Sequence, residues 1–150
     1  MHTDWIISFD TAYLSGIAWR LGSAAILGGL IGIEREWARK AAGLRTHMTV
    51  SVASAAFVLT VIDIGGVAAD VSRVIQGIAA GIGFLGAGTI LKKSSEEEIQ
   101  GLTTAATIFL TAAVGAAAGA GRVGIAIVCV IAAWLILTIL AGVERVMKRR

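Results

Sequence analysis

Five long apolar stretches dominate the sequence, and they limit most strongly what the chain can fold into. Each is close to the roughly 20 residues that an α-helix needs to cross the hydrocarbon core of a bilayer. None contains an acidic residue. Backbone amides find no water in lipid, so such stretches fold as helices. We therefore predict an all-α integral membrane protein, a single domain with transmembrane helices at about residues 14–33, 46–62, 73–91, 102–120 and 122–142.

The composition agrees with a membrane protein. The chain is 57% hydrophobic and 15% charged, and its mean hydropathy is +0.84, which is far from the usual mix of a soluble domain. It contains no proline that would kink a helix. Its single cysteine, Cys129, lies inside the fifth predicted helix, so it can form neither an intrachain disulfide nor a cysteine metal cluster.

Basic residues gather in alternate connections between the predicted helices. They are Arg35, Arg39, Lys40 and Arg45 in the first connection, Lys92 and Lys93 in the third, and Arg145, Lys148, Arg149 and Arg150 at the end. The positive-inside rule then places the amino terminus outside and the carboxyl terminus in the cytoplasm. The net charge of +3 is explained by this topology, and we expect no nucleic-acid partner.

A glycine pattern in the third predicted helix allows two interpretations. Gly81, Gly83 and Gly86 fit the G-x-G-x-x-G spacing of a dinucleotide loop, but no β-strand or soluble βα unit precedes them. Small residues inside membrane helices let backbones approach closely. We interpret the third helix as the most tightly enclosed one, with an unwound, ligand-facing segment as the alternative. The predicted packing glycines are Gly28, Gly32, Gly77, Gly81, Gly83, Gly86, Gly88, Gly115 and Gly119.

Two segments of the chain resemble each other. GLRTHMTVSVASA (43–55) aligns without gaps to GLTTAATIFLTAA (101–113), and both begin helices that enter from the same side. The first two helices are therefore predicted to be a parallel repeat of the third and fourth, with the fifth as an extra element. In duplicated membrane folds, functional groups lie at the junction of the halves. Chance similarity between helices rich in small residues is the alternative.

Threonines form a second pattern on the fourth predicted helix. Thr104, Thr107 and Thr111 recur at helical spacing, and Thr46 and Thr49 hold matching positions in the second helix. Hydrogen bonds between or within helices would explain them. A polar lining for an ion or a small solute is the functional alternative.

Charges near membrane depth are the other candidate site. Glu34, Arg35 and Glu36 follow the first predicted helix, where carboxylates oppose the helix dipole and therefore need partners. Arg45 is the expected partner for these carboxylates. Gln76 is the single amide inside a predicted span. The alternative is that these charges only mark the lipid boundary.

Several of these motifs together resemble the MgtC/SapB family of bacterial membrane proteins. They occur in order over about residues 16–142: GGLIGIERE (28–36), AAGLRTHM (41–48), GIGFLGAGTI (81–90), GLTTAATIF (101–109) and AVGAAAGAG (113–121). The resemblance implies a multi-pass protein of the bacterial inner membrane that supports growth in low magnesium and, in pathogens, virulence. It also implies a regulator that binds membrane partners such as an ATPase or the ATP synthase. Members with a soluble carboxyl-terminal domain continue beyond the fifth helix, so we expect a short, membrane-only form.

Three functions remain open from the sequence. A non-enzymatic regulator that acts through helix contacts, as a homodimer or with another membrane protein, is favoured. A channel or carrier for Mg²⁺ or another ion is the alternative, with Asp63 and Asp70 as possible outer metal ligands, since Mg²⁺ takes oxygen ligands. An enzyme is disfavoured because the two histidines, His2 in the tail and His47 at a loop edge, form no nucleophile and base pair. No cofactor is expected, although Mg²⁺ is a possible ligand or substrate. The lipid bilayer surrounds the helices.

Overall fold

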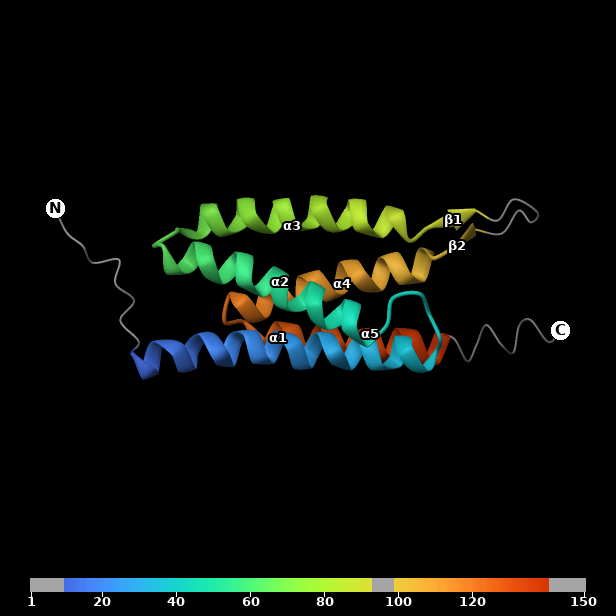
Figure 1. Ribbon diagram of the computed structural model, residues 1–150, viewed down its shortest axis with the longest axis horizontal. Coiled ribbons are helices and arrows are strands. Elements are labelled where there is room, and N and C mark those ends of the chain that lie inside the picture. Colours follow the sequence, from blue (N-terminus) through green and yellow to red (C-terminus); the bar gives the residue numbers. More distant parts are fainter. Residues whose placement is uncertain (1–9, 93–98, 141–150) are drawn as a thin grey trace.

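The computed structural model describes residues 10–92 and 99–140 and is all-α, as predicted (Figure 1). Two residues on each side of the connection between α3 and α4 form a small antiparallel ribbon, β1 (Leu91–Lys92) and β2 (Ile99–Gln100). The sequence analysis did not predict this ribbon. The helices are α1 (Thr11–Trp37), α2 (Leu44–Asp63), α3 (Ala68–Gly88), α4 (Leu102–Gly119) and α5 (Val123–Leu135), which continues as the π-helix η1 (Ile136–Leu140).

Four of the helices, α1 to α4, are long and apolar enough to cross a membrane. The protein is therefore a multi-pass membrane protein. The fifth helix continues through η1 to Leu140, and the end of its predicted range, residues 141–142, lies outside the described residues. The first helix is longer than predicted, and Glu34, Arg35 and Glu36 lie inside α1 rather than in the following loop. Which ends of the helices face the cytoplasm stays a prediction.

Local sequence explains where the first helix begins and ends. The carboxylate of Asp10 accepts a hydrogen bond from the backbone N–H of Ala12 at 3.0 Å and so caps the free amino end of α1. At the other end Arg39 has a φ of +52°, the left-handed conformation in which helices commonly stop. The short segment after it returns the chain to the start of α2.

Helix α4 lies at the centre of the bundle and packs against each of the other long helices. Its contact with α2 is close because Gly115 and Gly119 lie directly against the backbone of Ser51 and Ala55. On the other side of α2, Gly28 and Gly32 of α1 lie against the backbone around His47 and Leu44. Three helices, α1, α2 and α4, therefore share a core in which backbones nearly touch.

Two hydrogen bonds from a side chain of one helix to the backbone of another connect the helices. The guanidinium of Arg20 on α1 donates to the carbonyl oxygen of Gly119 at 3.0 Å, so a cation stabilises the carboxyl end of α4. The indole N–H of Trp134 on α5 donates to the carbonyl oxygen of Leu30 on α1 at 2.9 Å. Helix α1 is thus attached to both α4 and α5.

The prediction that the third helix is the most enclosed is wrong. In α3 only Gly86 is buried, and α3 lies at the edge of the bundle, beside α2 and α4 (Figure 1). A side-chain carbon added at Gly77, Gly81, Gly83 or Gly88 would meet no atom within 4 Å. Small residues permit close approach, but they do not specify which helix supplies the opposing surface. Within the described chain, no such surface covers these glycines.

Contacts between the helices support the predicted repeat. The gapless alignment that pairs Gly43 with Gly101 pairs His47 with Ala105 and, when the same offset is carried back along the chain, Gly28 with Gly86. In the structure Gly28 lies against the backbone of His47, and Gly86 lies against Ala105. The α1–α2 and α3–α4 pairs therefore meet at equivalent residues, although the second contact is looser.

The close approach of α2 and α4 gives a first prediction. In Gly115→Ala, the added methyl group would overlap the carbonyl oxygen of Ser51, and the helices must separate to relieve it. We expect the free energy of unfolding in detergent to fall by about 1–3 kcal/mol, the usual cost of overpacking a core. Gly22→Ala is the matched control, because Gly22 is also inside a helix but faces open space. Equal stability of the two variants would contradict the close α2–α4 contact.

Candidate functional site

A cluster of buried polar side chains begins where α1 ends and α2 and α4 start, at one end of the bundle, and reaches the middle of α4 (Figure 1). In a low-dielectric interior such groups are costly unless they are paired or hydrogen-bonded. We call this set the polar cluster; it comprises Glu34, Arg35, His47, Ser51, Thr104, Thr107 and Thr111.

The charged part of the polar cluster is an ion pair on the last turns of α1. The guanidinium of Arg35 is only 3% exposed and binds the carboxylate of Glu34 through two nitrogens, with Nη2 at 2.8 Å from Oε1. A pair so deeply buried depends on both partners, because removal of either leaves an unpaired charge in the core. The second terminal nitrogen of Arg35, Nη1, has no hydrogen-bond partner among the described residues.

His47 lies in the first turn of α2, next to the loop, and is fully buried, which the sequence analysis did not predict. Its Nδ1 is 2.8 Å from the carbonyl oxygen of Gly43, one turn earlier. Its Nε2 is 3.3 Å from the hydroxyl oxygen of Thr107 on α4. The ring therefore links the start of α2 to the middle of α4.

Threonines of α4 are buried along the side that faces α2. The hydroxyl of Thr107 donates to the carbonyl oxygen of Thr104 at 2.9 Å, and that of Thr111 donates to Thr107 at 2.8 Å. These hydrogen bonds within α4 agree with the interpretation that the threonines bond within or between helices. Thr46 is half-buried and Thr49 is exposed, so the matching positions on α2 do not join them.

Glu36 and Arg45 lie outside the polar cluster, at a cleft of about 420 Å³ beside the start of α2. The carboxylate of Glu36 accepts the backbone N–H of Leu44 at 3.1 Å and so caps this helix end from across the loop. Arg45 is exposed on the rim. The partner of Glu34 is thus its neighbour Arg35, whereas the sequence suggested Arg45.

The remaining predicted residues lie elsewhere. Gln76 is exposed on α3. Asp63 accepts the hydroxyl of Tyr13 at 2.7 Å, and Asp70 caps the start of α3 and pairs with Arg73 at 2.7 Å. In the described part of the chain, no three His, Cys, Asp or Glu side chains lie together as a metal site would require.

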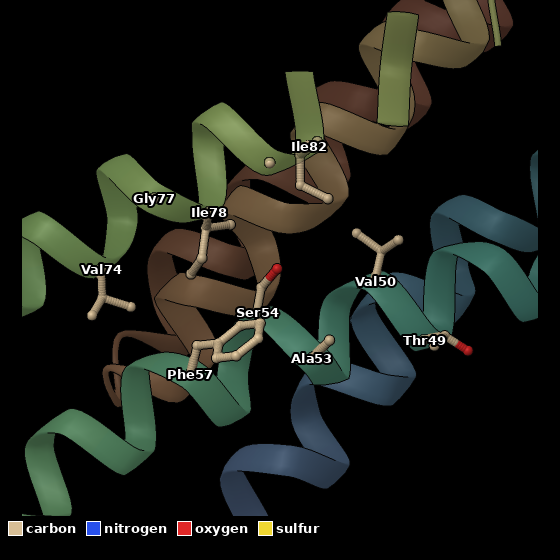
Figure 2. A pocket seen from close by; sticks show the side chains of 10 residues that line it. Thr49, Val50, Ala53, Ser54, Phe57, Val74, Gly77, Ile78 and Ile82 are labelled. Carbon is tan, nitrogen blue, oxygen red and sulfur yellow. The ribbon is translucent and has the colours of Figure 1, made fainter. Parts of the chain in front are cut away.

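A second candidate surface is an apolar groove of about 500 Å³ between α2 and α3 (Figure 2). Phe57 of α2 lies at one end of the groove, and the bare backbone of Gly77 and Gly81 forms part of the α3 side. We call this the α2–α3 groove; it is lined by Thr49, Val50, Ala53, Ser54, Phe57, Val74, Gly77, Ile78, Gly81 and Ile82.

Sequence reasoning missed His47, Ser51 and Ser54, which are all buried. A signal was present, because Gly43, His47 and Ser51 recur every four residues, and so lie on one face of a helix. The hydroxyl of Ser51 has no partner in the part of the chain that the structure describes. It lies between Gly28 and Gly115, at the closest approach of three helices.

A sequence profile of the MgtC family matches residues 21–146, which is most of the chain. The chain belongs to the MgtC family. It is 44% identical over 117 residues to the protein SrpB of Synechococcus elongatus, covering 71% of this chain and 64% of SrpB. It is 43% identical over 109 residues to the putative magnesium transporter YhiD of Escherichia coli K12, covering 68% and 50%. It is 39% identical over 100 residues to the protein MgtC of Salmonella typhimurium, covering 67% and 42%.

The matched part of the MgtC-family chain thus spans between 42% and 64% of the length of these relatives. The match to the family profile includes α1 from Leu21 onward and all the later helices, and so contains both the polar cluster and the α2–α3 groove. No solved structure shows significant similarity to the chain.

The ion pair in the polar cluster gives a second prediction. Glu34→Ala leaves the guanidinium of Arg35 buried and unpaired, and we expect the free energy of unfolding in detergent to fall by about 3 kcal/mol. Arg45→Ala is the control, because an exposed charge nearby should change stability by less than about 0.5 kcal/mol. The double variant Glu34→Leu, Arg35→Met should recover much of the loss. A Glu34→Ala protein as stable as the control would contradict the buried pair.

Proposed function

We propose that this MgtC-family protein is a non-enzymatic regulator of the bacterial inner membrane that supports adaptation to low magnesium and, in pathogens, virulence. It acts by binding another membrane protein, or a second copy of itself, through α3 and the α2–α3 groove. The observation that carries the proposal is the glycine-rich face of α3, which no other described helix covers.

The physical argument rests on how helices associate in lipid. Burial of apolar side chains gives little advantage there, because the lipid tails are equally apolar. Close backbone packing on small residues gives van der Waals contact that lipid tails cannot match. Gly77, Gly81 and Gly88 offer such a face, and Ile78 and Phe57 give the neighbouring groove a defined shape (Figure 2).

Magnesium enters through family membership. One relative carries the name putative magnesium transporter, and the motifs of this chain resemble a family linked to growth in low magnesium. The proposed partner is a second copy or a membrane ATPase such as the ATP synthase. We propose no cofactor, and Mg²⁺ is then a signal or ligand of the pathway that the protein serves.

Bulky substitutions on the α3 face test the regulator directly. We expect Gly77→Leu and Gly81→Leu to abolish support of growth in low magnesium by blocking close approach of a partner helix. The control is Gly124→Leu, because Gly124 is also exposed and has no atom within 4 Å of an added carbon. Growth of a deletion strain that carries each variant is the measurement, with equal membrane levels verified by immunoblot.

Full growth support by both α3 variants would contradict the proposed surface. Loss of support in the Gly124→Leu control as well would show that lipid-facing bulk is harmful anywhere on the protein, and would equally remove the argument for α3.

An ion channel or carrier is the competing function, and the buried polar cluster favours it. Flux of Mg²⁺ and monovalent cations into proteoliposomes distinguishes the two. We expect no flux above empty liposomes, because the hydroxyl of Thr111 donates within α4, that of Thr107 is occupied by Thr104 and His47, and Arg35 places a cation in the core. Flux that is lost in Glu34→Gln and in Thr107→Val would instead make the protein a transporter.

A further inference from the structure

The hydrogen bonds of His47 are not used by the proposed function. Nδ1 of the ring faces the carbonyl oxygen of Gly43 at 2.8 Å. Since a carbonyl oxygen only accepts, Nδ1 carries a proton in both the neutral and the positive ring. The same oxygen also accepts the backbone N–H of His47 at 3.2 Å, as its two lone pairs permit. One side of the ring is therefore fixed as a donor.

The other side of the ring faces a group that can both donate and accept. Nε2 lies 3.3 Å from the hydroxyl oxygen of Thr107, and that oxygen lies 2.9 Å from the carbonyl oxygen of Thr104. When the ring is neutral, the hydroxyl donates to Nε2. When Nε2 carries a proton, it donates to the hydroxyl oxygen, and the hydroxyl proton points to Thr104. Both states keep each ring nitrogen bonded, and only one hydroxyl hydrogen rotates.

Few charges act on this ring. Burial opposes a positive ring most strongly, and the hydrogen bond to Gly43 favours it; on α1 the guanidinium of Arg35 also opposes a positive ring and the carboxylate of Glu34 favours it, while their mutual ion pair fixes both. Glu36, farther along α1, is exposed and binds the backbone of Leu44.

The other helices that pack against α2 add no charge beside the ring. Helix α4 contains no titratable residue. Asp70 and Arg73 of α3 lie in its first two turns, next to the far end of α2, and Arg45 on α2 itself is exposed. A proton on His47 thus adds a unit charge at a place where the two nearest charges belong to one ion pair.

We propose that His47 is a proton-binding site at the interface of α2 and α4, and that the hydroxyl of Thr107 serves both of its protonation states. The bound proton completes a chain from the ring to Thr107 and on to the Thr104 carbonyl. In the neutral state the single hydroxyl proton can satisfy only one of its two acceptors. Proton binding therefore adds one hydrogen bond, from Thr107 to the Thr104 carbonyl within α4, while one hydrogen bond between α2 and α4 is kept in both states.

Nitrogen NMR of the full chain in lipid bilayers tests this site. The sample is labelled with ¹⁵N histidine and carries His2→Ala, so that all imidazole signals come from His47. Between about pH 8 and about pH 5, the range in which histidines commonly titrate, we expect Nδ1 to stay protonated and the Nε2 signal to move reversibly from acceptor to donor. A ring that stays neutral over this range, or an unprotonated Nδ1, would overturn the proposal.

Variants of Thr107 distinguish a proton site from a histidine that merely titrates. Thr107→Val removes the hydroxyl partner and with it the extra hydrogen bond of the protonated state. We expect the midpoint of the titration to fall by about one pH unit, which corresponds to one hydrogen bond. Thr107→Ser should restore the original midpoint. Thr111→Val is the matched control, because its hydroxyl is equally buried but bonds only within α4. An unchanged midpoint in Thr107→Val, or a shifted one in Thr111→Val, would refute the role of Thr107.

Discussion

The fold depends on the near contact of three helix backbones at Ser51. Gly28 of α1 and Gly115 of α4 lie against this residue from two sides. In lipid, helices gain little from burying apolar side chains, so such backbone contact is a main source of attraction between them. The positions of α1, α2 and α4 follow from this point, and α5 is then placed by its apolar contacts to Leu27 and Ile31 and by the hydrogen bond from Trp134.

The same close packing makes the polar cluster possible. Because α1, α2 and α4 exclude lipid and water at their common interface, the hydrogen bonds of His47 and the ion pair of Arg35 face no competing solvent. Such groups are strong when satisfied and costly when they are not. Rotation of the Thr107 hydroxyl from one acceptor to the other therefore changes the energy of this interior more than it would at a solvent-exposed surface.

The sequence was sufficient for the helical class, because long apolar stretches without acidic residues have only one common solution in a bilayer. The repeat stays a prediction, which the contacts of Gly28 and Gly86 with residues paired by the alignment support. The sequence failed for α3, because a stripe of glycines indicates that another helix can approach closely but does not indicate which helix does so. His47 was missed because its burial is created by α1 and α4, which lie far from it in the chain.

The two halves of the repeat differ in how completely they are covered. Helix α1 has α5 along its outer side, with Trp134 bonded to its backbone and stacked edge to face with Trp37 at a centroid distance of 6.4 Å. Helix α3, its counterpart, has no equivalent cover among the described helices. In the plane of a membrane, the open face of α3 gives the molecule one binding surface on that side. It can pair with a copy of itself or close off another protein, but through this face alone it cannot extend into a chain or lattice.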